Sequence, residues 1–483
     1  MARSIKRNFI YSASYQILNI LVPLVTTPIL ARTIGAEGNG VFSYTQSIAN
    51  YFVLFAQLGI TNYGVREIAR CGIDRELRSQ TFADLFGMSF TWGCLVVAAY
   101  FIYSFLFGIA YFPVMLIWSC WVIGSVLDVT WLLNGCEEFK VPMIRSACTR
   151  LAGMATIVLF VRSQSDVWIY VSAIAAPFLL NALLVWPFVS KYVDTRKPTL
   201  NGALSHIKPN LLLFIPVVAV SLYTLLDKVM LGVFGGMTQT GLYDYAEKVS
   251  KMPLAVVTAL GAVVLPRMTD VISSGKREEA KRLVSVTMWF MECVSLGICF
   301  GIIAVARDFC FLFFGYGYSG CIPLMQTMAI IVPLISATNV IGVQYLVPSG
   351  RDRQYTISVL FGAAVNVVIN LLFIAEFGAM AAAVATVAAE LAVLIAQLWM
   401  VRGELGIARI FCNLMPFACF GAFMCFIIRI STIVLGSYSV SVFGLCFEIT
   451  IGCFVYLLLS IGWCLLTKND SFIRLFSKWL PMK

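Results

Sequence analysis

The chain has 483 residues, of which 60% are hydrophobic and only 12% are charged. A soluble protein carries about 25% charged residues, so this composition excludes the soluble globular class. Apolar runs that continue for about 20 residues predict membrane-spanning helices, and they exclude a transmembrane barrel, whose strands alternate apolar and polar positions. The net charge of +10 therefore has to be read by where the basic residues lie.

Apolar runs between charge clusters predict fourteen spans and an all-α polytopic membrane protein. In chain order we expect them at residues 9–31, 40–62, 81–103, 112–133, 146–162, 167–190, 209–234, 241–265, 283–305, 322–347, 355–375, 379–400, 410–429 and 443–466.

The basic residues predict the orientation of these spans. With the N-terminus inside, 26 of the 34 lysines and arginines fall in cytoplasmic segments and only 4 fall in outer ones. Short cytoplasmic loops of membrane proteins are enriched in lysine and arginine. We therefore predict that both termini are cytoplasmic, and the positive charge indicates topology, with no nucleic-acid partner.

An internal repeat recurs at an offset of 201 residues. GAEGNGVFSY at 35–44 matches GMTQTGLYDY at 236–245, with the glycines at positions 1 and 6 of each segment aligned. Six spans separate the copies, so the repeats are parallel, which is typical of alternating-access transporters. We expect a six-helix bundle at 1–200, a second at 201–403, a central cavity between them, and two further helices with a cytoplasmic tail at 404–483.

The repeat also aligns two polar stripes at helical spacing. Asp244, Glu247, Lys248 and Lys251 follow i, i+3, i+4, i+7, which places them on one helix face. Their equivalents one repeat earlier are all polar, and these are Ser43, Gln46, Ser47 and Asn50. A charge in the bilayer is costly without water or a partner, so these stripes are candidate cavity linings. Purely structural pairing of acid and lysine at i, i+4 is the alternative.

Other charges also fall inside predicted spans. Asp227 and Lys228 could line the same cavity. Lys228 could instead extend its side chain to the membrane interface. Arg150 lies one turn inside its predicted span. Glu292 and Glu390 lie near mid-span, where a carboxyl can exchange a proton or Na⁺ during transport. We treat Asp227, Glu292 and Glu390 as candidates for ion coupling.

Motifs for catalysis are missing from the sequence. It contains no G-x-x-x-x-G-K-[ST] loop, and its one histidine, His206, belongs to no nucleophile or zinc motif. We therefore expect no enzyme activity, no metal site and no cofactor, apart from a proton or Na⁺ gradient as energy source.

Residues 366–390, NVVINLLFIAEFGAMAAAVATVAAE, resemble the helix 11–12 signature of bacterial polysaccharide flippases, the O-antigen and teichoic-acid transporter family within the multidrug/oligosaccharidyl-lipid/polysaccharide exporter superfamily. In this pattern Asn366 and Asn370 share one helix face, and Gly378 lies in a short outer turn, so these three are candidate helix-packing residues. LGITNYGVREIAR at 58–70 and TPILARTIGAEGNGVFSY at 27–44 are similar to the same family.

The resemblance implies movement of an undecaprenyl-pyrophosphate-linked oligosaccharide from the cytoplasmic to the outer leaflet of the bacterial plasma membrane, for surface polysaccharide synthesis. A pyrophosphate needs cationic partners, which Lys228, Lys248, Lys251, Arg32 and Arg150 could supply. The implied partners are the lipid-linked substrate, membrane lipids, and polymerase and chain-length proteins. Lipid II flipping, cation-coupled drug export and a non-transporting assembly role remain alternatives.

Overall fold

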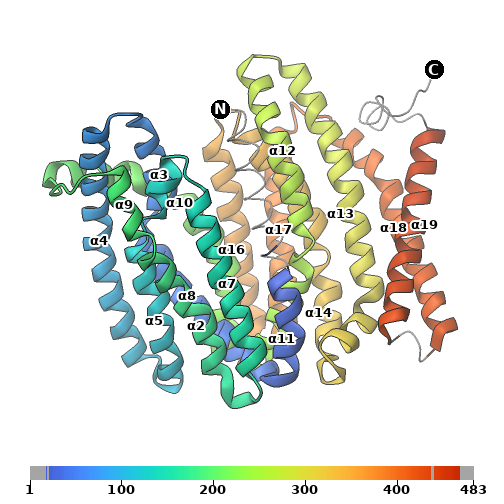
Figure 1. Ribbon diagram of the computed structural model, residues 1–483. Coiled ribbons are helices and arrows are strands. Elements are labelled where there is room, and N and C mark those ends of the chain that lie inside the picture. The colour runs from blue at the N-terminus through green and yellow to red at the C-terminus, as the bar shows by residue number, and fades with distance from the viewer. Residues whose placement is uncertain (1–17, 19–20, 437–439, 468–483) are drawn as a thin grey trace. The chain divides into compact units, whose positions relative to one another are not determined.

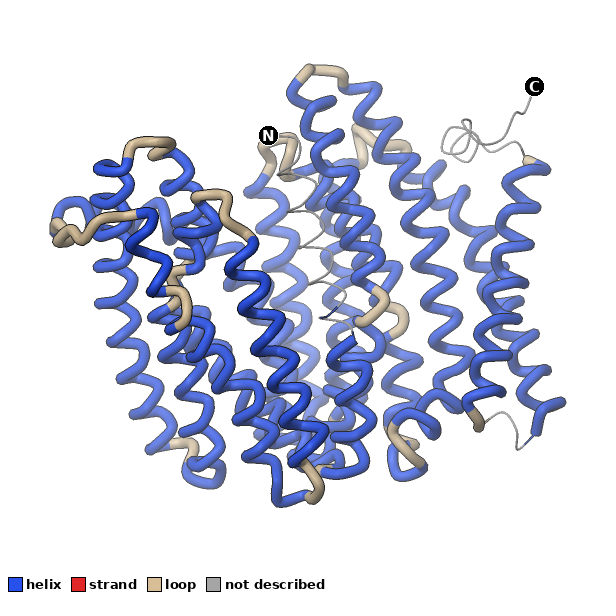
Figure 2. Tube along the Cα trace, viewed as in Figure 1, coloured by secondary structure: helices blue, strands red, loops and turns tan. Residues whose placement is uncertain are grey.

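The computed structural model describes residue 18, residues 21–436 and residues 440–467. Every regular element in this part of the chain is a helix, as Figure 2 shows, so the predicted all-α class is confirmed. The described chain divides into two compact units, Met1–Gly241 and Leu242–Lys483. This division is based on contacts between residues and not on the repeat. It therefore does not test the repeat-based boundaries at residues 200 and 403, which stay predictions.

The first unit is built from helices of very different lengths (Figure 1). Its elements are the helix Leu21–Thr33, α2 (Gly35–Gln57), α3 (Ile60–Arg70), α4 (Arg75–Leu106), α5 (Phe112–Leu127), α6 (Thr130–Gly135), α7 (Lys140–Phe160), α8 (Val167–Leu183), α9 (Trp186–Tyr192), α10 (Leu200–Met230) and the π-helix η3 (Leu231–Gly235). Short 3-10 turns η1 (Ile109–Tyr111) and η2 (Gln164–Asp166) precede α5 and α8. The helix α11 (Met237–Lys251) begins in this unit and continues into the second.

The core of the first unit lies where α2, α5 and α8 pack together. Phe42 of α2 stacks on Tyr170 of α8 with ring centroids 3.9 Å apart. Trp118 of α5 donates its indole N–H to Thr45 Oγ1 of α2 at 3.0 Å. A buried Trp N–H requires an acceptor, and this bond fixes the face that α2 turns toward α5.

The second unit continues with α12 (Leu254–Ser273), α13 (Arg277–Phe313), the 3-10 turn η4 (Tyr316–Tyr318), α14 (Cys321–Met328), α15 (Ile331–Thr338), the π-helix η5 (Asn339–Leu346), α16 (Asp352–Phe377), α17 (Ala379–Val401), α18 (Ile407–Leu435) and α19 (Val442–Leu466). The helices α16 and α17 pack so tightly at Gly362 that a Cβ there would overlap Val393 and approach the carbonyl oxygen of Ala389. Small residues permit such close helix contact in membranes. The helices α18 and α19 lie beside α13 (Figure 1), where Tyr456 donates to the carbonyl of Cys293 at 2.6 Å.

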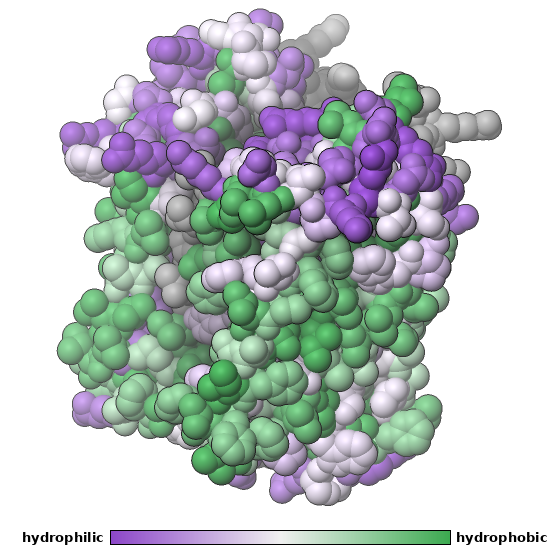
Figure 3. Space-filling model, turned by 90° about the vertical axis from the view of Figure 1, so that its left-hand side faces the viewer, coloured by the Kyte–Doolittle hydropathy of each residue, from purple (hydrophilic) through white to green (hydrophobic). Residues whose placement is uncertain are grey.

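Eleven described helices or helix runs are long and apolar enough to cross a membrane. Of the first predicted span, the structure describes residue 18 and the part that lies in the 13-residue helix Leu21–Thr33. The predicted count of fourteen spans therefore stays a prediction. On the face shown in Figure 3, hydrophilic residues gather mainly at one end and hydrophobic residues cover the zone below it, as expected for a lipid-exposed surface.

Several spans that the sequence predicts as single helices are interrupted. The span predicted at 241–265 breaks between α11 and α12 because Pro253, the cap residue of α12, has no N–H to continue the hydrogen-bond ladder. Within the span predicted at 40–62, α2 ends just before Leu58 and Gly59, which both have positive φ angles. The span predicted at 112–133 breaks at Asp128, whose backbone is extended. These breaks correct the predicted element boundaries.

The first pair of aligned glycines in the repeat has similar φ angles. Gly35 at the start of α2 has a φ of 74°, and its equivalent Gly236 just before α11 has a φ of 84°. Glycine is the residue that adopts this region without a steric penalty. Within the first unit, the second pair of aligned glycines marks a close approach, because a Cβ at Gly40 would overlap the carbonyl of Met237 and a Cβ at Gly241 would overlap that of Ala36.

Candidate functional site

The charged stripe predicted on α11 is present on one helix face and is internally paired. Lys248 Nζ lies 2.6 Å from Asp244 Oδ2, and Lys251 Nζ lies 2.6 Å from Glu247 Oε1. The two carboxyls are buried, with 1% and 8% of their side-chain surface exposed, whereas the lysines keep 28% and 31%. The acids are thus held inside the protein, and each lysine retains an accessible side on which it could meet an anion.

Aromatic residues on the neighbouring positions fix the orientation of α11. The Tyr243 hydroxyl lies 3.0 Å from Thr386 Oγ1 of α17, and both side chains are buried. Tyr245 packs against Phe314 and Tyr318, with centroids 5.2 and 5.6 Å away. Because these two tyrosines are anchored in the second unit, the face that carries the two lysines cannot rotate freely. This anchoring preorganises the stripe.

The equivalent stripe on α2 is also turned away from solvent. Ser43 and Ser47 are buried, and Gln46 and Asn50 are half-buried. The Ser47 hydroxyl donates to the carbonyl of Ser43 at 2.8 Å. This hydroxyl is therefore satisfied within its own helix, so α2 offers mainly amide groups that could bind sugar hydroxyls.

The remaining predicted charges of the first unit lie in different surroundings. Asp227 near the end of α10 is buried, and it lies close enough to Tyr51 of α2 to interact electrostatically. Lys228 and Arg150 are half-buried, and Arg32 is exposed. Their predicted role as substrate cations stays a prediction.

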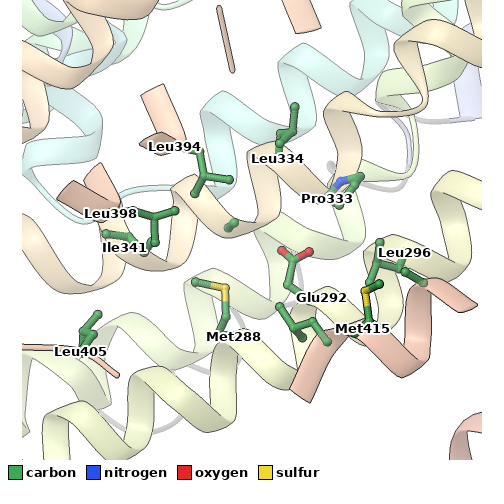
Figure 4. Close-up of a pocket in the computed structure, with 13 residues that line it drawn as sticks. Met288, Glu292, Leu296, Pro333, Leu334, Ile341, Leu394, Leu398, Leu405 and Met415 are labelled. Atoms are coloured by element: carbon green, nitrogen blue, oxygen red, sulfur yellow. The ribbon is translucent and has the colours of Figure 1, made fainter. Parts of the chain in front are cut away.

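Glu292 of α13 projects into an apolar cavity of about 240 Å³ in the second unit (Figure 4). The cavity lies among α13, α15, η5, α17 and α18, and its other lining groups include Met288, Leu334, Leu394 and Met415. Ser295 donates to Glu292 Oε2 at 3.3 Å, whereas Oε1 has no hydrogen-bond partner among the described residues. A buried carboxyl in such an environment favours the neutral, proton-bearing state or a bound cation.

The residues of the predicted helix 11–12 signature occupy packed positions. Asn370 donates to Asn366 Oδ1 at 3.2 Å within α16, and both amides are fully buried. Gly378 has a φ of 54° and forms the turn into α17. Glu390 is buried in α17 and interacts electrostatically with Tyr355 of α16. The bond between the two amides lies within α16, so their role in packing one helix against another stays a prediction.

The sequence analysis did not predict a pair of buried carboxyls in the second unit, Asp308 and Glu448. Glu448 of α19 accepts from Thr432 of α18 at 2.7 Å and interacts with Asp308 of α13. Both acids are buried. A signal was present, because Glu448 is the one charged residue of the last predicted span, but its partner Asp308 follows Arg307 outside a predicted span.

Known proteins resemble the chain over most of its length. The model of a family described as polysaccharide biosynthesis protein matches residues 5–272. The chain belongs to this family. This confirms the membership that the resemblance indicated, and with eleven apolar helices it makes the chain a multi-pass membrane protein.

Two relatives of the chain carry functional names. The "Putative O-antigen transporter" of Escherichia coli strain K12 is 24% identical over 413 residues, which cover 83% of the chain and 97% of the relative. The "Probable low-salt glycan biosynthesis flippase Agl15" of Haloferax volcanii is 22% identical over 395 residues, which cover 80% of each.

Solved structures show which fold the chain has. A lipid II flippase, MurJ, in an inward closed conformation superposes with a TM-score of 0.76 at 14% identity, covering 96% of the chain and 99% of that structure. An inward-facing multidrug resistance MATE transporter of the MOP superfamily gives a TM-score of 0.64 at 14% identity, covering 82% and 95%. The fold is therefore that of these membrane transporters, and fold alone does not assign a substrate.

Proposed function

We propose that this protein is an alternating-access flippase that moves an undecaprenyl-pyrophosphate-linked oligosaccharide from the cytoplasmic to the outer leaflet of the plasma membrane. The family match, together with relatives named as an O-antigen transporter and a glycan flippase, supports a role in surface polysaccharide synthesis. The observation that carries the proposal is the α11 stripe, whose lysines are partly exposed while their carboxylate partners are buried.

The chemistry of this substrate fits the polar groups that each of the two helices carries in its own unit. A pyrophosphate is best held by ammonium or guanidinium groups, and Lys248 and Lys251 present such groups from a helix fixed by its tyrosines. Sugar hydroxyls pair with amides and hydroxyls, which Gln46 and Asn50 of α2 supply. The hydrocarbon tail can stay in the bilayer, so the protein has to shelter only the polar head.

The buried acids provide a route to energy coupling. Glu292 lies in an apolar cavity with one oxygen atom that no described group satisfies. Binding of a proton or Na⁺ there would change the charge inside the second unit, and alternating access needs such a differential interaction between states. Asp227 and Glu390 are further candidates for this step.

Complementation tests the proposal. A strain that lacks its own flippase for a defined lipid-linked oligosaccharide should regain surface glycan when it expresses this chain. Accumulation of the lipid-linked precursor on the cytoplasmic face despite normal insertion of the protein would contradict the proposal.

Cation-coupled drug export is the second candidate, favoured by the same Glu292 cavity. A carboxyl surrounded by apolar side chains is a site for a lipophilic amine. Export of such an amine from cells that express the chain, with no effect on surface glycan, would favour this alternative.

A further inference from the structure

A large groove lies within the first unit, away from any residue assigned above. It measures about 1100 Å³ and is bordered by α4, α9, the segment 193–199 and the first half of α10. Its walls are largely apolar and rich in aromatic rings, and they include Phe82, Phe86, Phe90, Leu95, Trp186 and Leu204. The size matches a ligand with long hydrocarbon chains better than a water-filled gap.

The segment 193–199 borders the groove and is fixed to α4. Arg75 Nη2 lies 2.8 Å from Asp194 Oδ1, and Arg196 Nη2 lies 2.7 Å from Glu76 Oε1. Thr199, which caps α10, also donates to the buried carboxyl of Asp84. These links make this polar border of the groove a preformed rim.

The rim carries surplus positive charge. Lys197 of the segment 193–199 and Lys191 at the end of α9 are exposed, whereas the charge of Arg196 is balanced by Glu76. Neither lysine forms an ion pair with another described residue, and the Asp194 carboxylate is already bound by Arg75. A basic rim above an apolar cavity matches an amphiphile with an anionic head, and basic pockets between membrane helices recognise such lipid heads.

The length of the groove along α4 is similar to the thickness of one lipid leaflet. Its wall on α4 runs from Phe82 to Leu95, and 13 residues of α-helix span about 20 Å. Half of a hydrocarbon core is about 15 Å thick. Figure 3 shows that the hydrophilic zone of the viewed face is concentrated at one end and that apolar surface follows it.

We propose that this groove binds an anionic glycerophospholipid of the surrounding bilayer. Its acyl chains lie along α4 between Phe86, Phe90 and Leu204, and its phosphate meets Arg196 and Lys197 at the rim. The charge of the rim selects an anionic head over a zwitterionic one. Because the rim segment connects α9 to α10, the bound lipid braces the start of α10.

Two tryptophans that line the groove, Trp92 and Trp186, give a direct readout. We would titrate the full chain in detergent with phosphatidylglycerol or phosphatidylcholine brominated on its acyl chains, which quench nearby indoles. The groove signal is the quenching lost in the Trp92→Phe, Trp186→Phe double variant. Trp399, 62% exposed on α17, reports non-specific contact with lipid through the matched variant Trp399→Phe.

We expect the groove signal to saturate at a lower lipid concentration than the Trp399 signal. We also expect phosphatidylglycerol to produce it at lower concentration than phosphatidylcholine. Removing two charges in Arg196→Gln, Lys197→Gln should weaken that preference about tenfold. Ala203→Phe, which fills the groove and leaves both tryptophans in place, should abolish the saturable phase. A groove signal that follows the bulk lipid fraction, shows no head-group preference or survives Ala203→Phe would overturn the proposal.

Discussion

Lys251 Nζ and Glu247 Oε1 lie 2.6 Å apart, one helical turn from each other on α11. The acid precedes the lysine by four residues, which is the favourable orientation for such a pair. The same geometry joins Asp244 and Lys248. Both ion pairs are therefore present in the structure, and their presence is compatible with binding, because an ammonium held by one carboxylate can still donate to a phosphate on its accessible side.

Substitution of the two α11 lysines separates binding from pairing. Lys248→Ala with Lys251→Ala should abolish surface glycan while leaving the protein inserted, because the pyrophosphate loses its cations. Surface glycan is measured by lectin blot and insertion by the amount of protein in the membrane fraction. Normal glycan display in this double variant would remove both lysines from the substrate site.

A neutral pair provides the matched control for stability. Lys251→Met alone should lower the free energy of unfolding by about 1–3 kcal/mol, because it leaves the buried Glu247 without its partner. Adding Glu247→Gln should restore most of the stability, as measured by thermal unfolding in detergent, but not transport. Recovery of both stability and glycan display in the neutral pair would show that the pair is purely structural.

The Glu292 cavity predicts a gradient-dependent step. Glu292→Gln keeps the size of the side chain and removes its charge, so transport in proteoliposomes should lose its response to an imposed pH or Na⁺ gradient. Glu279→Gln on the same helix is the control, because Glu279 is exposed and pairs with Arg267 at the surface. Unchanged gradient dependence in Glu292→Gln would exclude this residue from coupling.

The glycine contact predicts a stability cost. A methyl group at Gly241 would overlap the carbonyl of Ala36, so Gly241→Ala should destabilise the protein by about 1–3 kcal/mol and lower its melting temperature. Gly462→Ala on α19 should have little effect, because no heavy atom lies within 4 Å of an added Cβ there. Equal melting temperatures for the two variants would contradict the close approach.

The rim of the first unit predicts a pH effect. The hydrogen bond from Arg75 holds the pKa of the Asp194 carboxyl below its usual value. A carboxyl whose folded-state pKa is lowered stabilises the protein above its unfolded pKa, and this stabilisation is lost as the pH falls through the folded value. The melting-temperature difference between wild type and Asp194→Asn should thus be largest near neutral pH and vanish in acid. A constant difference would refute this linkage.

Local patterns in the sequence predicted much of the molecule. Four polar residues at helical spacing placed Asp244, Glu247, Lys248 and Lys251 on one face, since a helix fixes that relationship by its geometry. The repeat likewise predicted matching glycines, and Gly35 and Gly236 both have positive φ angles. Such features depend on a few consecutive residues, so the sequence alone carries them.

Features that depend on distant segments could not be predicted in this way. The cavity around Glu292 requires side chains from five elements, and the groove of the first unit requires α4, α9 and α10 together. The pair of Asp308 and Glu448 joins helices 140 residues apart in sequence. Periodicity says which face of a helix is polar, but it does not say which other helix that face meets.

Reconstituted transport tests the central claim most directly. The purified chain in proteoliposomes should move an undecaprenyl-pyrophosphate-linked oligosaccharide from one leaflet to the other, measured as the fraction that becomes accessible to an added glycosidase. We predict that this fraction rises with time for the wild type and stays at the protein-free level for the Lys248→Ala, Lys251→Ala variant. Equal accessibility with and without the wild-type protein would contradict the proposal that it is a flippase for this class of lipid.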